Sequence, residues 1–135
     1  MKVNLGRRAT SALAVAMVAA GTVAATAGAA SADANQWVPI GQVHGVGVYA
    51  SSWNTDASNK IATDLLPSDG GDEVQVTCWT HGLDIDGQGN VWYQSVNVYY
   101  TWYGVYSLPQ TGYEYGAYVD GNAWFHANTW DECAS

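Results

Sequence analysis

The sequence predicts an all-β protein with one small domain, and three observations support this fold class. From residue 33 onward, apolar and polar residues tend to alternate with a period of two. Runs rich in Val, Tyr and Trp are separated by clusters of Gly, Pro, Asn and Asp. No apolar pattern of helical period extends over the length of a helix. We therefore expect residues 33–135 to form one domain of five to seven short strands.

The first half of this domain is expected to contain short strands joined by polar segments. Residues 37–40 open the domain, and residues 43–49 alternate along a strand in which glycines suggest bends or bulges. Residues 51–60 are mostly polar and predict a loop. The short run at 61–66 precedes a turn at 67–72 that contains Pro, Ser, Asp and Gly.

The clearest strands lie in the middle of the domain. Residues 73–80 alternate polar with apolar side chains, as a strand with one buried face does. The loop at 81–90 leads to a second β-prone segment at 91–96, so we expect a hairpin with an extended tip. Residues 96–106 continue as an uncharged β-prone run, which could be core, a binding surface or an edge that pairs two chains.

The end of the domain is expected to contain a turn at 108–112, a last strand at 113–119 and a tail that reaches Cys133. The two cysteines of the chain, Cys78 and Cys133, both follow the predicted export signal. An even count in an oxidising compartment predicts one disulfide, with two free thiols as the alternative. Closing so long a loop stabilises the fold by roughly 4 kcal/mol on the chain-entropy estimate.

The first 32 residues have the layout of a secretory signal peptide. Three basic residues within the first eight precede an apolar run at 12–20 and a small-residue stretch that ends in an A-x-A site at Ala32. We expect cleavage after Ala32 and a secreted, extracellular protein. The alternative, a membrane anchor, is weaker because Ala, Gly and Thr drive insertion poorly and no stop-transfer charges follow. Sec export is favoured, but twin-arginine export stays open.

The charge of the chain after residue 32 limits its partners. Twelve acidic residues face the single base Lys60, which gives a formal charge of −11 with neutral histidines. Without arginines or a lysine cluster, the protein has nothing with which to neutralise a phosphate backbone, so we expect no nucleic acid partner. The same acidity argues against anionic membrane surfaces once the signal is cleaved.

Five motifs follow one another in an order that is typical of one family. They are Val48-Tyr49-Ala50, Ile61-Ala62 with Leu65, Gly71-Asp72-Glu73-Val74-Gln75-Val76, Trp92-Tyr93-Gln94-Ser95 and Tyr115-Gly116-Ala117-Tyr118-Val119. In this order they resemble the bacterial SH3-like (SH3b) domains of exported proteins, over roughly residues 46–119. The resemblance implies a small SH3-like barrel and ligands in the cell envelope, commonly peptidoglycan peptides or related wall components. Two features depart from the family pattern: Tyr49-Ala50 replaces an arginine that often follows the first strand's Val, and a long aromatic stretch separates Ser95 from Tyr115.

All seventeen aromatic residues follow residue 32, which is more than the core of so small a domain can hide. Four residues on the best strands are assigned to packing, namely Trp79, Trp92, Tyr115 and Val119. By strand alternation, Tyr100 and Trp102 share one face, and Tyr99 and Tyr103 share the other. One of these faces is expected to be a platform that stacks on sugars or extended peptides. The candidate binding residues are Tyr99, Tyr100, Trp102, Tyr103 and Tyr106.

Catalysis is the weaker interpretation. No Gly-x-Ser-x-Gly motif is present, and the cysteines are expected to be paired. Two of the acids Asp84, Asp86, Glu114 and Asp120 could serve a glycosidase, but a domain of this size leaves little room for a deep cleft.

Metal binding has equally weak signals. The loop at 84–90 has alternating oxygen donors like a calcium loop, yet it lacks a third acid and a distal bidentate Glu, so we interpret it as a polar hairpin tip. The three histidines show no zinc spacing. We expect no catalytic residue, no metal and no cofactor.

The sequence therefore predicts a secreted, non-catalytic binding module for a cell-wall component, a peptidoglycan peptide or glycan, contacted through exposed aromatic residues. The first alternative is a domain that binds another extracellular protein, as an inhibitor or toxin does. The second is a small wall hydrolase that uses Asp84, Asp86 or Glu114.

Overall fold

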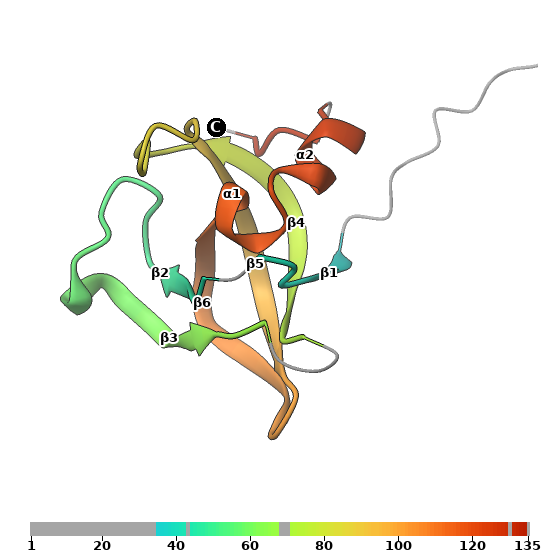
Figure 1. The fold of residues 1–135 in the computed structure, drawn as a ribbon. Coiled ribbons are helices and arrows are strands. Elements are labelled where there is room, and N and C mark those ends of the chain that lie inside the picture. Colours follow the sequence, from blue (N-terminus) through green and yellow to red (C-terminus); the bar gives the residue numbers. More distant parts are fainter. Residues whose placement is uncertain (1–34, 43, 68–70, 130, 135) are drawn as a thin grey trace, which may run out of the picture.

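The computed structural model describes residues 35–42, 44–67, 71–129 and 131–134. These residues form one antiparallel sheet of six strands with two short α-helices (Figure 1). The predicted all-β class and the predicted number of strands are confirmed. The predicted signal peptide at 1–32 lies outside the described residues, as do Val43 and residues 68–70 of the predicted turn.

The strands differ greatly in length. They are β1 (Gln36–Pro39), β2 (Val46–Tyr49), β3 (Lys60–Leu65), β4 (Glu73–His81), β5 (Val91–Tyr100) and β6 (Gly104–Tyr115). A single turn of 3-10 helix, η1 (Ala57–Asn59), precedes β3 inside the predicted polar loop. Figure 1 shows β4, β5 and β6 as long, curved strands with the tip of the β5–β6 hairpin projecting at one end.

The sheet is open, which corrects the expectation of a closed barrel. Its strand order is β1-β4-β5-β6-β2-β3, and no pairing joins the edge strands β1 and β3 among the described residues. β2 is also short, and it pairs with β6 only at Tyr49 and Tyr113. Most of the outer edge of β6, from Gly104 onward, therefore has no strand partner in the described part of the chain.

The predicted hairpin between β4 and β5 is confirmed, with pairing from Glu73↔Tyr99 to His81↔Val91. The predicted turn at 108–112 is wrong, because β6 runs through this segment. Ser95 pairs with Gly112 and Asn97 with Ser107, so residues 108–111 bulge opposite a single residue of β5. A bulge accommodates Pro109, which cannot donate a ladder hydrogen bond.

The predicted last strand at 113–119 is half wrong. β6 ends at Tyr115, and the chain continues as α1 (Gly116–Val119) and then α2 (Ala123–Ala127). A Cβ at Gly116 would lie 2.6 Å from Asn122 Oδ1, so this close approach of two segments requires glycine. The Asp120 carboxylate accepts hydrogen bonds from the backbone N–H groups of Ala123 (3.1 Å) and Trp124 (2.8 Å), which stabilises the start of α2.

The core consists of two clusters of buried side chains. The larger cluster contains Val38, Ile40, Val46, Val48, Leu65, Val74, Val76, Trp79, Tyr93, Val98, Leu108, Val119 and Trp124. The smaller contains Trp92, Tyr115 and Ala117, with Leu83 and Ile85 of the β4–β5 loop packed against it. The assignment of Trp79, Trp92, Tyr115 and Val119 to packing is thereby confirmed.

The predicted disulfide between Cys78 and Cys133 is confirmed. It fastens the C-terminal tail to β4 beside two backbone hydrogen bonds. The Trp79 N–H donates to the Asp131 carbonyl (3.0 Å), and the Cys133 N–H donates to the Trp79 carbonyl (2.8 Å). The tail thus continues the sheet over a short parallel bridge between Trp79 and Glu132.

Candidate functional site

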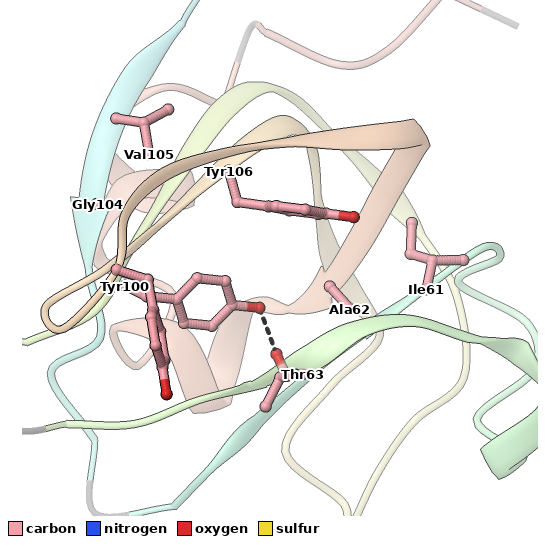
Figure 2. Close-up of a pocket in the computed structure, with 8 residues that line it drawn as sticks. Ile61, Ala62, Thr63, Tyr100, Gly104, Val105 and Tyr106 are labelled. Atoms are coloured by element: carbon pink, nitrogen blue, oxygen red, sulfur yellow. Dashed lines mark hydrogen bonds between the residues drawn. The ribbon is translucent and has the colours of Figure 1, made fainter.

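A groove of about 420 Å³ lies between the tip of the β5–β6 hairpin and β3. It is lined by Ile61, Ala62, Thr63, Tyr100, Tyr103, Gly104, Val105 and Tyr106. Three consecutive residues come from β3 and five from the β5–β6 hairpin, so backbone edges as well as side chains form its walls. Figure 2 shows the rings of Tyr100 and Tyr106 projecting into the space above β3, while Val105 points away from them.

The shape of the hairpin tip comes from a tight turn at residues 101–103. The Tyr103 N–H donates to the Tyr100 carbonyl at 3.0 Å, and Gly104 follows with φ +81°, a conformation that favours glycine. The turn brings the Tyr100 and Tyr103 rings together, with centroids 6.5 Å apart and planes at 75°. These two rings therefore form adjoining walls at nearly right angles.

A buried carboxylate joins the tip to the end of β3. Asp72 is 5% exposed, and its Oδ1 accepts hydrogen bonds from the Thr101 N–H (2.9 Å) and the Thr101 hydroxyl (3.1 Å). Its Oδ2 accepts a hydrogen bond from the Leu66 N–H (2.8 Å). One side chain thus holds two segments that are far apart in sequence, and Asp72 is a positioning residue for the groove.

Tyr100 also crosses from β5 to β3. Its hydroxyl donates to the Thr63 carbonyl at 2.7 Å (Figure 2). Burial, assisted by the negative charge of Asp72, raises the pKa of the Tyr100 phenol to about 12. The phenol stays protonated at neutral pH, so it remains a hydrogen-bond donor to β3.

The structure brings three of the five sequence-predicted binding residues together and leaves two outside. Tyr100, Tyr103 and Tyr106 line the groove. Tyr99 is on β5 but does not line the groove, and Trp102 is 86% exposed at the turn. The predicted separation of Tyr100 and Tyr103 on opposite faces is wrong, because strand alternation ends at the turn.

The opposite wall of the groove, residues 61–63, was not among the sequence-predicted site residues. These residues lie on a short strand without a clear alternation, and they meet the aromatic run only through tertiary structure. The one family motif that touches them is the Ile61-Ala62 pair. Nothing in their residue types indicates a binding site.

In the described part of the chain, no charged side chain lines the groove. Lys60, the only base after residue 8, already binds Asp64, with its ammonium nitrogen 2.6 Å from Oδ1 and 2.9 Å from Oδ2. The same ammonium lies 5.8 Å from the centre of the Tyr49 ring, which is not part of the groove. Among the described residues that line the groove, none carries a positive charge.

The acidic residues that could serve catalysis lie in different parts of the structure and in different environments. Glu114 is fully buried, and the Ser95 hydroxyl lies 2.6 Å from its Oε1. Asp84 and Asp86 belong to the exposed β4–β5 loop, where Asp84 accepts a hydrogen bond from the Gly89 N–H (3.2 Å) and Asp86 from the Tyr118 hydroxyl (2.6 Å). Glu114 therefore faces neither the groove nor this loop.

The β4–β5 loop is held against the sheet by aromatic side chains. The Tyr115 hydroxyl donates to the Gly89 carbonyl (2.7 Å), and the Trp92 ring N–H donates to the Leu83 carbonyl (2.9 Å).

In the described part of the chain, no group of three or more His, Cys, Asp or Glu side chains could hold a metal ion. None of the described helices is long and apolar enough to cross a membrane.

Comparison with known proteins gives no match: no protein-family model, no curated protein and no solved structure resembles this chain closely enough to assign it to a group.

Proposed function

We propose that this protein is a secreted, non-catalytic binding module, of the bacterial SH3-like kind, that recognises a cell-envelope component, a peptidoglycan peptide or glycan. The observation that carries the proposal is the groove in which Tyr100, Tyr103 and Tyr106 face β3. Flat rings offer a large apolar area at low entropic cost, and their hydroxyls can bond polar ligand edges.

Exposure of the groove supports a binding role. Tyr103 is 89% exposed and Tyr106 48%, so neither ring is needed to complete the core. An aromatic patch left in water at one end of a rigid sheet is typical of an interaction site. The groove volume lies near the lower end of the roughly 300–1,000 Å³ range of ligand pockets, and it suits a short peptide segment or one or two sugar rings.

The location assigned to the protein rests on two sequence features and one structural feature. The signal-peptide layout of residues 1–32 predicts export, and the acidic composition disfavours nucleic acid and anionic lipid as partners. The disulfide between Cys78 and Cys133 is compatible with an oxidising compartment.

A second candidate function is binding of another extracellular protein, in the manner of an inhibitor or toxin. The observation that favours it is the hairpin tip, where Trp102 and Tyr103 project with little cover from the rest of the protein. Exposed Trp and Tyr residues are the side chains that most often dominate protein interfaces. Binding of a protein partner would use Trp102, whereas binding of a ligand in the groove alone would not require this residue.

The test is co-sedimentation of the exported, disulfide-bonded protein with purified peptidoglycan. We expect the wild type to sediment with the wall, and Tyr103→Ala/Tyr106→Ala to weaken binding by about tenfold or more, as the loss of two stacking contacts implies. The matched control is Tyr99→Ala, which removes a tyrosine of β5 that does not line the groove.

The outcomes separate the candidates. Wild-type protein that stays in the supernatant would contradict wall binding. Loss of binding in Trp102→Ala but not in the double tyrosine variant would place recognition at the exposed turn and favour the protein-partner function. Release of soluble wall fragments by the protein would overturn the non-catalytic assignment.

A further inference from the structure

The groove combines three aromatic rings with a local excess of negative charge. The Tyr100 and Tyr103 rings meet at 75°, and the Tyr106 ring extends over Ala62 as a third surface (Figure 2). The faces of aromatic rings carry negative partial charge and attract cations within about 6 Å of the ring centre. A pocket lined by several ring faces therefore favours binding of a cation over binding of a neutral group of the same size.

Among the residues that the structure describes, no Lys or Arg supplies a cation to these rings. Lys60 lies on β3, next to the groove residue Ile61, but its ammonium is held by Asp64 and lies over Tyr49. The sequence has no other lysine or arginine after residue 8. The rings therefore remain open to a cation from a ligand.

Two carboxylates lie near the groove without lining it. Asp64 directly follows the groove residue Thr63 and is paired with Lys60, and Asp72 accepts a hydrogen bond from the Thr101 N–H of the hairpin tip. Burial makes the largest contribution to the raised pKa of Tyr100, and the charges of Asp72 and Asp64 add to it, so these carboxylates contribute a negative potential at the ring. This potential repels an anionic ligand, and it also opposes the approach of a second copy of so acidic a chain.

We propose that the groove binds an alkylammonium group, the free amine of a lysine-type side chain, against the rings of Tyr100, Tyr103 and Tyr106. This inference rests on the proposed function and narrows it. Among envelope components, the ligand is an amine-bearing wall peptide and not a neutral glycan. The cation gains contact with the ring faces, and its methylene stem packs on Ile61 and Ala62.

Three small peptides test the inference directly. Acetyl-Gly-Lys-Gly-amide carries the amine, its Nζ-acetyl derivative has the same stem without charge, and its Nζ-trimethyl derivative keeps the charge without N–H donors. Binding is measured by NMR titration of the exported, disulfide-bonded protein. We expect acetylation to weaken binding about tenfold and trimethylation to preserve it, because attraction to ring faces needs charge and not hydrogen bonds.

Variants of the exposed rings locate the effect. Tyr103→Leu and Tyr106→Leu keep an apolar side chain at positions that do not complete the core, so the fold is preserved. Each is expected to reduce the preference for the charged peptide severalfold, whereas Tyr103→Phe keeps the ring face and the preference. Trp102→Leu is the matched control, since it removes an exposed aromatic ring outside the groove.

Two results would overturn the inference. One is equal binding of the lysine and acetyl-lysine peptides, and the other is no binding of any peptide at about 10 mM. Co-sedimentation with peptidoglycan whose free amines have been acetylated separates this inference from the proposed function. Undiminished binding to the acetylated wall would reject amine recognition and leave wall binding intact, whereas failure to bind untreated wall would reject the proposed function whatever the peptides show.

Discussion

Replacement of Glu114 by glutamine tests how the sheet accommodates a buried acid. The Glu114 side chain is fully buried, with the Ser95 hydroxyl 2.6 Å from Oε1 and no hydrogen-bond partner for Oε2 within the described structure. Burial raises the pKa of this carboxyl from 4.5 to about 8, and the Ser95 hydrogen bond offsets only part of the increase. At neutral pH the group is therefore protonated in the folded protein and ionised in the unfolded chain.

The size of the effect follows from this difference. Between pH 4.5 and about 8 folding takes up a proton, so the free energy of unfolding falls as pH rises through that interval. Each pH unit costs about 1.4 kcal/mol, which amounts to about 5 kcal/mol over the whole interval and about 3 kcal/mol between pH 5 and pH 7. Glutamine cannot ionise, and any cost of its buried amide, about 1–3 kcal/mol, does not depend on pH.

The assay is urea unfolding of the disulfide-intact protein at pH 5, 6 and 7, followed by tryptophan fluorescence. We expect the free energy of unfolding of Glu114→Gln, relative to the wild type, to improve by about 3 kcal/mol between pH 5 and pH 7. Glu132→Gln, in the exposed C-terminal tail, controls for the loss of one formal charge. Parallel pH profiles of Glu114→Gln and the wild type would refute the reasoning.

Three further predictions concern stability and the groove. Cys78→Ser/Cys133→Ser should lower the free energy of unfolding by about 4 kcal/mol, measured by urea unfolding against the disulfide-bonded wild type, because the bond closes a loop with a sequence separation of 55. Asp72→Ala should cost about 1–3 kcal/mol and broaden the NMR signals of the hairpin tip, since Leu66 and Thr101 lose their shared acceptor; a sharp, unchanged tip spectrum would contradict the positioning role. Gly82→Ala should destabilise the protein because its Cβ would collide with the Ser52 carbonyl oxygen, whereas Gly87→Ala, at an open but left-handed position, should cost only about 1 kcal/mol in the same assay.

Those parts of the fold that depend on local pattern could be predicted from the sequence. β4 alternates over most of its nine residues, and β5 is a ten-residue run of mostly β-prone residues. The disulfide followed from the count of cysteines and the expected compartment. The helices α1 and α2 have four and five residues, too few to show a helical period, and were missed.

The misassigned turn at 108–112 shows how a correct local signal can have another structural use. Pro109 and Gly112 do mark a break in regular pairing, but the break is a bulge within β6 and not a reversal of the chain. Glu114 was considered as a catalytic acid because sequence alone does not show burial. Its place on the inner side of β6 follows from the register that the bulge sets.

Only one wall of the groove, the one formed by aromatic residues, could be predicted from the sequence. The aromatic composition of residues 96–106 indicated the ring-bearing wall, because exposed aromatic residues are unusual in so small a domain. The β3 wall and the Asp72 contacts depend on segments that meet only after the sheet has curved. In the sequence, Asp72 belongs to a predicted turn and to a family motif, and neither indicates that its carboxylate binds Thr101.

The strand order β1-β4-β5-β6-β2-β3 has a consequence for how the chain is made. β1 cannot pair until β4 has been synthesised, and β2 cannot pair with β6 until nearly the whole chain is present. No N-terminal portion can therefore complete the sheet by itself while synthesis is in progress. Such long-range pairing delays folding until nearly the whole chain is present. Such late folding is compatible with an export route that threads unfolded polypeptide through a narrow translocation pore.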